Sequence, residues 1–346
     1  MDKYQISILT EEDYEEYKRF LKENKESLYE HSLEVKELVS KYFKFKPKYL
    51  IAKENNKIVG ALPLFEAKSL IQGKRLVSIP FFPYGGVIGE CKKGLLETAK
   101  ELSKDVKFLQ IRQRNGLEPE LEKDFVRQAP ILDFLVNLTE SPEEMWASLK
   151  RDVRKNIKKA KKNGLKFELG RNKKELDDFY DIYLNTRKKR GVPAWPKGLF
   201  EEALKSHDSL IGLVYQKDKP IAAGFFSFYN KEIVYGFSGA DYNKINLCPY
   251  HLLVWNMCRY GIKKGYTVLD YGPTTKEMND GGLFDFKSRW CDEHNELPYY
   301  FYAANKENVP ALQNDFKLYK LYGKIWSRLP KWVINKISPF IIRQFS

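Results

Sequence analysis

The sequence predicts a mixed α/β fold made of two related domains in tandem. In the second half, "LIGLVYQKDKPIAAGFFSFYNKEIVYGFSGADY" (210–242) is typical of three strands joined by tight polar turns, followed by a helix from about Pro249 and a strand at "YTVLDYGP". Earlier, "YLIAKENNKIVGALPLFE" (49–66) has the same order, with Gly60-Ala61 in the place of Ala222-Ala223. A duplicated unit predicts two similar domains with a cleft between them, as in a transferase that holds two substrates.

The other elements follow from local patterns. Helices are expected at 10–26, with Thr10 as N-cap, and at 32–43, 95–103, 141–164 and 175–186. Strands are expected at 49–54, 58–66, 76–79, 106–114 and 129–138, and a Pro/Gly-rich loop at 80–90. We therefore expect a first domain at 1–139, a second at 140–322, and a basic amphipathic tail at 323–346.

The composition is that of a globular chain with enough apolar residues for two cores. Of 346 residues, 43% are apolar and 14% aromatic. The four cysteines form no CxxC pair, and the chain begins with charged residues where a secretory signal would be apolar, so we expect a reduced, cytoplasmic location. No apolar run approaches the ~18 residues needed to cross a bilayer. The net charge of +14 favours phosphate-rich or anionic-lipid partners without choosing between them.

The predicted helix at 141–164 has one apolar and one basic face. The apolar stripe recurs at spacings of three or four residues: Trp146, Leu149, Val153, Ile157 and Ala160. Cations crowd the remaining positions, with almost no acidic partner four residues away, so like charges repel along this face. This favours a phosphate-binding face, for which Arg154, Lys158 and Lys162 are the candidates. A solvated surface helix is the alternative.

A second basic cluster, "RKKRGVPAWP" (187–196), ends in a Gly/Pro loop. The guanidinium groups of Arg187 and Arg190 suit two-pronged binding of a carboxylate or phosphate, and a purely structural role for Arg190 is equally compatible. Tyr84 and Gly85 in "PYGG" are candidates to shape a substrate pocket, with a structural turn as the alternative.

Five segments in a fixed order carry a family resemblance: "MWASLKRDVRKNIKKAKKNG", "YLNTRKKRGVPAWP", "KPIAAGFFSFYNKEIVYGFSGAD", "YTVLDYGPT" and "GGLFDFKSRW". In this order they resemble the FemAB-like group of tandem GNAT-fold transferases, over roughly Glu34 to Tyr302. The resemblance implies two GNAT-like acyltransferase domains. It also implies transfer of an aminoacyl group from aminoacyl-tRNA to an amino group of a cell-wall peptide precursor. No single diagnostic motif carries it.

The resemblance also suggests roles for individual residues. Phe286-Lys287 matches an aromatic–Lys pair that relatives place beside the tRNA acceptor end, which makes both donor-binding candidates, together with Arg154, Lys158 and Lys162. Lys287 and Asp270 are the catalytic candidates, the first stabilising the oxyanion and the second accepting a proton from the incoming ammonium or only capping a loop. The acceptor-binding candidates are Arg187, Arg190, Tyr84 and Gly85.

Direct transfer to an amine needs no covalent enzyme intermediate, because a neutral amine is already a nucleophile. The segment "GADYNKINLCPYHL" (239–252) lacks the clustered glycines of a coenzyme A pyrophosphate loop, which favours aminoacyl-tRNA over an acyl thioester.

We expect no metal and no bound cofactor. Tyr235, Tyr242 and Tyr271 are interpreted as packing or hydrogen-bonding residues. The alternatives are an N-acyltransferase with a thioester donor and a non-catalytic RNA- or membrane-binding protein on the same fold.

The tail "YGKIWSRLPKWVINKISPFIIRQF" (322–345) interleaves aromatic and aliphatic residues with cations. This pattern suits a helix lying on an anionic membrane surface, and a tail packed back on the protein is the alternative. Shallow contact with the inner face of the membrane would bring the protein close to a lipid-linked acceptor.

Overall fold

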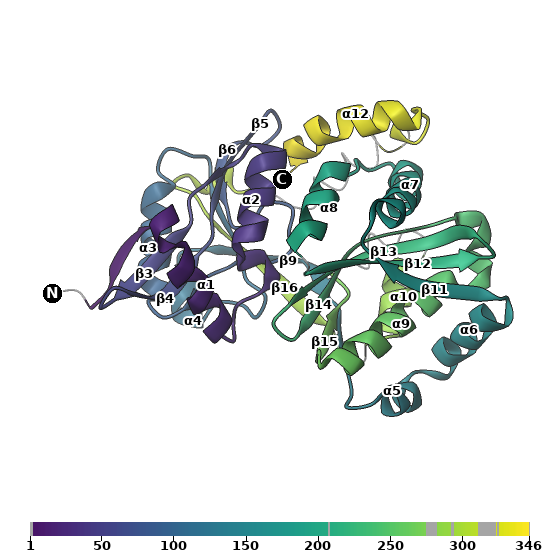
Figure 1. The fold of residues 1–346 in the computed structure, drawn as a ribbon. Helices are drawn as coiled ribbons and strands as arrows, with labels where there is room; N and C mark the ends of the chain where they lie inside the picture. Colours follow the sequence, from purple (N-terminus) through teal and green to yellow (C-terminus); the bar gives the residue numbers. More distant parts are fainter. Residues whose placement is uncertain are drawn as a thin grey trace. The chain divides into compact units, whose positions relative to one another are not determined.

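The computed structural model describes residues 3–206, 208–274, 282–291, 294–310, 323 and 325–345, and it divides into two compact units (Figure 1). Unit 1 comprises the chain up to Ile131, a segment that begins at Glu296, and the last residues from Phe340. Unit 2 comprises Leu132–Asn295 and a later segment that ends at Pro339. Each unit is described by itself.

Unit 1 contains two sheets and four helices within the described residues. Its elements are β1 (Gln5–Ile8), α1 (Tyr14–Glu23), α2 (Leu33–Phe43), β2 (Lys46–Pro47), β3 (Leu50–Glu54), β4 (Lys57–Leu62), β5 (Phe65–Ser69), β6 (Gly73–Val77), β7 (Ile88–Gly89), α3 (Lys92–Leu102), β8 (Leu109–Arg112), α4 (Pro119–Glu122), β9 (Val126–Asp133) and β16 (Asn295–Tyr302). One sheet has the order β1-β3-β4-β7 and the other β2-β5-β6-β8-β16-β9. α3 packs on the first sheet and buries Leu95, Leu96 and Ala99 there.

Unit 2 is a single sheet with helices on both faces. Its elements are β10 (Leu135–Asn137), α5 (Pro142–Ser148), α6 (Arg151–Lys162), β11 (Leu165–Gly170), α7 (Lys173–Arg190), α8 (Lys197–Ala203), β12 (Ser209–Gln216), β13 (Lys219–Tyr229), β14 (Glu232–Ala240), α9 (Pro249–Lys264), β15 (Val268–Asp270), α10 (Leu283–Ser288) and most of α12 (Lys331–Ile342). The strand order is β10-β15-β14-β13-β12-β11. α7 and α8 cover one face, and α5, α6 and α9 lie on the other (Figure 1).

The two units repeat one order of elements, which confirms the predicted duplication. Unit 2 runs strand, two helices, three antiparallel strands, helix, strand and short helix from β11 to α10. Unit 1 has the same order from β1 to α4 once β2, β5 and β6, which belong to its second sheet, are set aside, so that β1-β3-β4-β7 corresponds to β11-β12-β13-β14. The small-residue pairs occupy equivalent hairpin positions, because Gly60 pairs with Ala52 and Ala222 pairs with Val214. Small side chains are needed at least at Gly60, where an added Cβ would lie 2.1 Å from the Glu90 carbonyl oxygen.

The division of the chain into units does not follow sequence order alone. β10 lies before residue 139, the end of the predicted first domain, yet it pairs with β15 in the sheet of unit 2. β16 follows the elements of unit 2, yet it pairs with β8 in unit 1. Each unit therefore takes a strand from the part of the sequence that a simple boundary assigns to the other domain.

Two predicted elements are interrupted. The expected strand at 58–66 is divided into β4 and β5, which belong to different sheets, because Pro63 has no N–H to continue the ladder. The expected helix at 141–164 is divided into α5 and α6 by Leu149 and Lys150, whose ψ angles are 140° and 146°. The break buries Leu149 and lets the Lys150 ammonium donate to the Ser288 carbonyl at 2.9 Å. Tertiary contacts thus override the helical periodicity there.

The described part of the tail contains α12, which packs one face on the protein. Ile334 and Ser338 are buried, Ala194 N–H donates to Ser338 Oγ at 3.0 Å, and Tyr180 donates to Asn335 Oδ1 at 2.7 Å. The opposite face exposes 71% of Trp332 and 60% of Phe340. No helix in the described ranges is both long enough and apolar enough to span a bilayer.

Candidate functional site

Two neighbouring strands of unit 2 separate at the centre of the candidate site. β14 and β15 run parallel but pair only over Glu232–Val234 and Val268–Asp270, after which β14 continues to Ala240. The pairing of β13 with β14 also skips Gly236, which forms a bulge at the same level. Diverging strands leave backbone groups and side chains accessible to a ligand between them, which makes this point a candidate binding site.

Lys287 closes the turn that follows β15. It lies on α10, is only 6% exposed, and its Nζ donates to the carbonyl oxygens of Gly272 at 2.8 Å and Pro273 at 3.2 Å. Burial lowers the pKa of the ammonium to about 8, while the nearby carboxylates of Asp270 and Asp133 oppose this shift. Lys287 is thus a cation held in place by backbone carbonyls, with a pKa near physiological pH.

Asp270 is buried at the end of β15, where it organises the same turn. Its Oδ1 accepts a hydrogen bond from Gly272 N–H at 2.7 Å, and Gly272 has a φ of +68°. The carboxylate therefore caps the turn whose carbonyls bind Lys287. A part for Asp270 in accepting a proton stays a prediction.

Phe286, on α10, contacts three other ring side chains near the candidate site. Its ring centroid lies 6.0 Å from Tyr271, 4.9 Å from His251 and 6.1 Å from Tyr250. Burial lowers the pKa of His251 to about 4, and its Nε2 lies 3.1 Å from the Asn156 side-chain amide. His251 is therefore a neutral packing residue at physiological pH.

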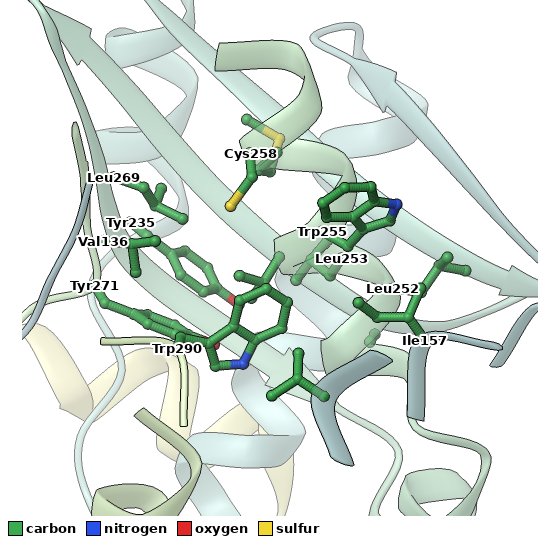
Figure 2. Close-up of a cluster of buried hydrophobic side chains, with 14 of the residues drawn as sticks. Val136, Ile157, Tyr235, Leu252, Leu253, Trp255, Cys258, Leu269, Tyr271 and Trp290 are labelled. Atoms are coloured by element: carbon green, nitrogen blue, oxygen red, sulfur yellow. The ribbon is translucent and has the colours of Figure 1, made fainter. Parts of the chain in front are cut away.

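Tyr235 and Tyr271 directly follow the last paired residues of the two diverging strands. Their rings stack at 5.3 Å, and both belong to the buried cluster shown in Figure 2. Neither hydroxyl has a hydrogen-bond partner within the described ranges. Burial raises the pKa of Tyr235, and the nearby Ser238 hydroxyl opposes that rise. The sequence indicated packing or hydrogen-bonding roles for both tyrosines. A signal for a ligand-binding role was their position on two predicted apolar strands of the same domain.

The basic face of α6 is only partly free to bind phosphate. Arg154 donates to the Ala147 carbonyl at 2.7 Å and the Trp146 carbonyl at 3.3 Å, so it caps the end of α5. Lys158 Nζ lies 5.9 Å from the Trp146 ring centroid. Cations that make no ion pair with any described residue remain on the exposed face: Lys155, Lys159, Lys161 and Lys162.

The two arginines of the second basic cluster differ. Arg187 donates through Nε to the Pro193 carbonyl at 2.9 Å and lies over Tyr183, so it holds the loop after α7. Arg190 is exposed and donates to the Tyr242 hydroxyl at 3.0 Å. Burial is the main cause that lowers the pKa of Lys287, and the positive charge of Arg190 adds a smaller contribution in the same direction. Acceptor binding by either arginine stays a prediction.

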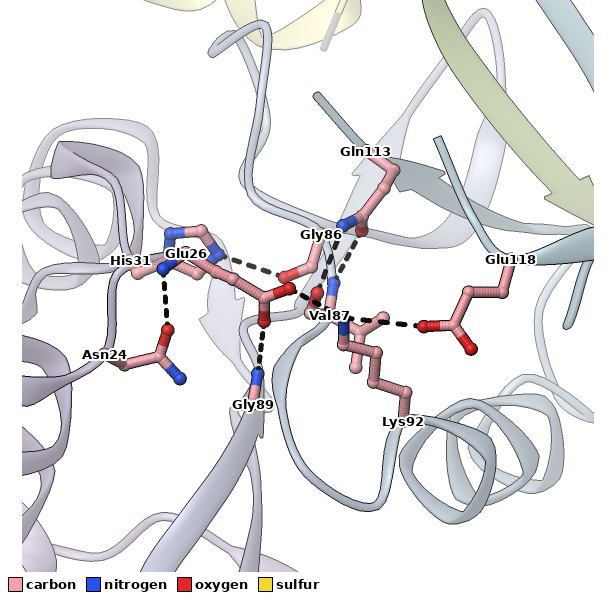
Figure 3. Close-up of polar contacts among 9 residues, drawn as sticks. All are labelled: Asn24, Glu26, His31, Gly86, Val87, Gly89, Lys92, Gln113 and Glu118. Carbon is pink, nitrogen blue, oxygen red and sulfur yellow. Dashed lines mark hydrogen bonds and ion pairs between the residues drawn. The ribbon is translucent and has the colours of Figure 1, made fainter. Parts of the chain in front are cut away.

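Tyr84 and Gly85 lie in a pinned loop of unit 1. Tyr84 is buried beneath the Arg114 guanidinium, 4.7 Å from the ring centroid, and Gly85 has a φ of +130°. Next to them, His31 Nε2 bonds the Gly86 carbonyl at 3.1 Å, and Gln113 bonds both backbone groups of Val87 (Figure 3). These contacts favour the structural-turn interpretation, and acceptor binding here stays a prediction.

A cavity of about 320 Å³ lies in unit 2 beside the break between α5 and α6. Leu135, Asn137, Met145, Ser148, Leu149, Lys150, Arg289, Trp290 and Cys291 line it. Arg289 forms an ion pair with Asp152 at 2.9 Å, which together with the Lys150–Ser288 bond ties the start of α6 to the end of α10. The basic helix is thus held against the segment that carries Phe286 and Lys287.

Comparison with known proteins shows what this part of the chain resembles. The model of the acetyltransferase (GNAT) domain family matches residues 147–288. The UDP-N-acetylmuramoylpentapeptide-lysine N(6)-alanyltransferase of Weissella viridescens is 22% identical over 166 residues, 46% of this chain and 48% of that protein. The crystal structure of FemX aligns with a TM-score of 0.63 at 15% identity, over 91% of this chain and 99% of that one. In sequence and in fold, the chain is similar to FemAB-like proteins.

The predicted GNAT-like fold of both units is confirmed by the solved structures. L-PGS from Bacillus licheniformis aligns with a TM-score of 0.58 at 12% identity, over 93% of this chain and 100% of that one. A tandem GNAT protein from the clavulanic acid pathway gives 0.51 at 10% identity, over 89% and 99%. The chain matches about half the length of the Weissella relative, and identities this low establish fold and not substrate.

Proposed function

We propose that this protein is an aminoacyltransferase. It moves an aminoacyl group from aminoacyl-tRNA to an amino group of a cell-envelope peptide precursor by direct transfer. The observation that carries the proposal is Phe286-Lys287, held by backbone carbonyls where β14 and β15 separate, inside the stretch that matches the GNAT family model. The alanyltransferase named above supports the acceptor class, because its own acceptor is a muramoylpentapeptide lysine.

The chemistry requires few groups from the protein. The neutral acceptor amine attacks the ester carbonyl, the C–N bond forms, the C–O bond to the tRNA ribose breaks, and the amine proton ends on the released hydroxyl. The protein aligns the reactants and stabilises negative charge on the carbonyl oxygen. Lys287 is a cation at the turn after β15 that could serve this purpose, and Asp270 is a carboxylate on the same turn.

A polyanionic donor fits the charge of α6. Lysines without ion-pair partners in the described part of the chain project from this helix, whose N-terminal end is tied to α10. The region after β14 forms a 3₁₀ turn (Tyr242–Leu247) and then α9, with no glycine between Gly239 and Gly261 to form a wide phosphate loop. This favours tRNA. The match to an acetyltransferase domain family favours a thioester donor as the second candidate.

The exposed face of α12 supports a peripheral place at the cytoplasmic side of the membrane. Trp332 and Phe340 project there beside Lys331 and Lys336, which is the composition of an interfacial helix on anionic lipid. A lipid-linked acceptor would then lie within reach of the enzyme.

A donor screen tests the proposal. The purified protein is incubated with UDP-N-acetylmuramoylpentapeptide and either tRNA charged with radiolabelled amino acids or labelled acetyl-CoA. Transfer that needs charged tRNA and disappears after ribonuclease treatment is expected. Ribonuclease-resistant transfer from acetyl-CoA would overturn the tRNA donor and leave an N-acyltransferase. No transfer from either, with tRNA or vesicle binding retained, would support a non-catalytic binding protein.

A further inference from the structure

We infer that the hydroxyls of Tyr235 and Tyr271 bind the carbonyl oxygen of the acyl group that the protein transfers. This rests on the proposed function, and it adds two ligand-binding residues and the chemical group that they recognise. An acyl carbonyl is common to an aminoacyl ester and to a thioester, so the inference covers both donors.

The first support is that both hydroxyls lack partners. The two side chains are more than nine-tenths buried, and neither oxygen has a hydrogen-bond partner within the described ranges, so they do not bond to each other either. Buried hydroxyls are nearly always hydrogen-bonded, because losing water without a replacement is unfavourable. Phenylalanine would fill the same space without that penalty. Two tyrosines side by side indicate a partner that a ligand brings.

The second support is their position. Tyr235 directly follows the last β14 residue paired to β15, and Tyr271 directly follows the last residue of β15, so both stand where the strands separate. Their rings stack, and Tyr271 also contacts Phe286, the neighbour of Lys287. The Lys287 ammonium lies 5.6 Å from the Tyr271 ring centroid. The phenols therefore adjoin the candidate catalytic cation.

The third support is another buried donor that has no acceptor among the described residues. The indole N–H of buried Trp290, 6.5 Å between ring centroids from Phe286, has no acceptor among the described residues either. Burial raises the pKa of both phenols well above the ordinary value, so each keeps its proton at physiological pH. A ligand oxygen with lone pairs, as in a carbonyl, satisfies such donors.

In the reaction the phenols donate hydrogen bonds and keep their protons. As the amine nitrogen bonds to the carbonyl carbon, the carbonyl oxygen gains negative charge, which hydrogen bonds from the two hydroxyls stabilise. The oxygen loses that charge when the bond to the leaving ribose oxygen or coenzyme A sulfur breaks. The amine proton passes to that leaving atom, so no proton moves to or from Tyr235 or Tyr271.

Tyr235→Phe, Tyr271→Phe and the double variant test this, because each change removes only an oxygen. Tyr49→Phe is the matched control, since Tyr49 is a buried tyrosine of unit 1 whose hydroxyl also lacks a partner within the described ranges. Tyr183→Phe is the control for a structural hydroxyl, because Tyr183 accepts a hydrogen bond from Trp195 N–H at 3.1 Å. Thermal melts and kcat are measured for all.

We expect each site variant to lose about 100-fold in kcat, with a melting temperature equal to or above wild type, while Tyr49→Phe keeps wild-type kcat. Wild-type kcat in the double variant would overturn the inference. A decrease in the melting temperature of the site variants as large as that of Tyr183→Phe would also overturn it, because such a decrease would show that the hydroxyls have partners within the protein.

A binding measurement separates this inference from the donor proposal. The probes are adenosine carrying a 3′-alanylamide, which cannot be hydrolysed, and acetyl-CoA. If wild type transfers only from acetyl-CoA, the proposal of a tRNA donor is wrong. In that case the inference about Tyr235 and Tyr271 requires the double variant to bind acetyl-CoA more weakly than wild type does. If wild type transfers from neither donor, at least tenfold weaker binding of one probe by the double variant still supports the inference. Equal binding by both proteins, or no binding of either probe to wild type, overturns it.

Discussion

The ammonium of Lys287 lies 2.8 Å from the carbonyl oxygen of Gly272, and this contact joins α10 to the turn after β15. The Asp270 carboxylate fixes the same turn through the Gly272 N–H, at 2.7 Å. The sequence indicated Lys287 and Asp270 as two separate candidates. In the structure both bind Gly272, Lys287 through the carbonyl oxygen of the glycine and Asp270 through its N–H group. The geometry gives Lys287 a structural contact in addition to its proposed catalytic part, and the two have to be measured separately.

The Lys287→Met variant separates the structural contribution of Lys287 from its proposed catalytic role. The variant loses hydrogen bonds from a charged donor, each of which contributes about 1.5–3 kcal/mol, so we expect a melting temperature several degrees lower with the fold retained. Below that temperature, turnover on the true donor should fall about 100-fold, because a preorganised cation is missing. Steady-state kinetics and thermal melts on the same samples measure both effects.

Lys100→Met is the matched control. Lys100 is a similarly buried lysine of unit 1, bonded to Glu97 and Asp124, so its loss should lower stability without changing turnover. A folded Lys287→Met protein with wild-type turnover would remove Lys287 from the catalytic group and leave Arg190 and Asp270 as candidates.

His31 predicts an acid-sensitive contact in unit 1. Its Nδ1 accepts from Leu28 N–H at 3.0 Å, so Nε2 is the protonated nitrogen and donates to Gly86. Burial lowers the pKa of His31 to about 4 from an ordinary 6.5. Below pH 6.5 the unfolded chain therefore binds a proton at His31, whereas the folded chain binds it only near pH 4. The contribution of His31 to the free energy of unfolding thus decreases as the pH falls from 6.5 to 4 and is constant above pH 6.5.

His31→Gln should remove this part of the pH dependence. We expect the variant to be less stable than wild type at pH 7.5, because it loses buried hydrogen bonds, and the difference should narrow towards pH 4.5. Urea unfolding at several pH values measures it. Parallel stability curves for the two proteins would contradict the assignment.

The sequence predicted features that one or two residues determine. Thr10 begins the first helical segment with a hydrogen bond from its N–H to Asp13, and Gly164 ends α6 with a φ of +71°. The hairpin pairs at Gly60 and Ala222 also appeared as expected. These depend on local backbone chemistry, which a sequence displays directly.

Contacts between distant segments were not predictable in the same way. The break at Leu149 is stabilised by burial and by Ser288, more than a hundred residues away. Arg154 looked free to bind phosphate because its partners are backbone carbonyls, which residue types do not reveal. The Tyr235 and Tyr271 hydroxyls, which have no partner in the part of the chain that the structure describes, are recognised only once the two strands are seen to separate.

The free lysines of α6 predict salt-dependent RNA binding. Lys155, Lys159 and Lys162 share one face and are exposed, so their replacement by Gln should weaken tRNA binding. The slope of log affinity against log salt should fall by about 0.7–0.9 for each phosphate that the protein no longer neutralises. Replacing Lys22, Lys25 and Lys57 of unit 1, which are also exposed, changes the net charge equally and is the control. An unchanged slope in the α6 variant would make this helix a solvated surface.

The two faces of α12 predict different consequences for the tail. Trp332→Ala with Phe340→Ala removes exposed apolar groups, so binding to vesicles that contain phosphatidylglycerol should weaken while transfer to a soluble acceptor continues. Leu70→Ala, at an 88% exposed leucine of unit 1, is the control for reduced surface hydrophobicity. Ile334→Asp on the buried face should instead lower the melting temperature, because it places a charge where the side chain has no exposure. Vesicle sedimentation decides the point: equal binding by wild type and the Trp332/Phe340 variant would leave α12 with a packing role alone.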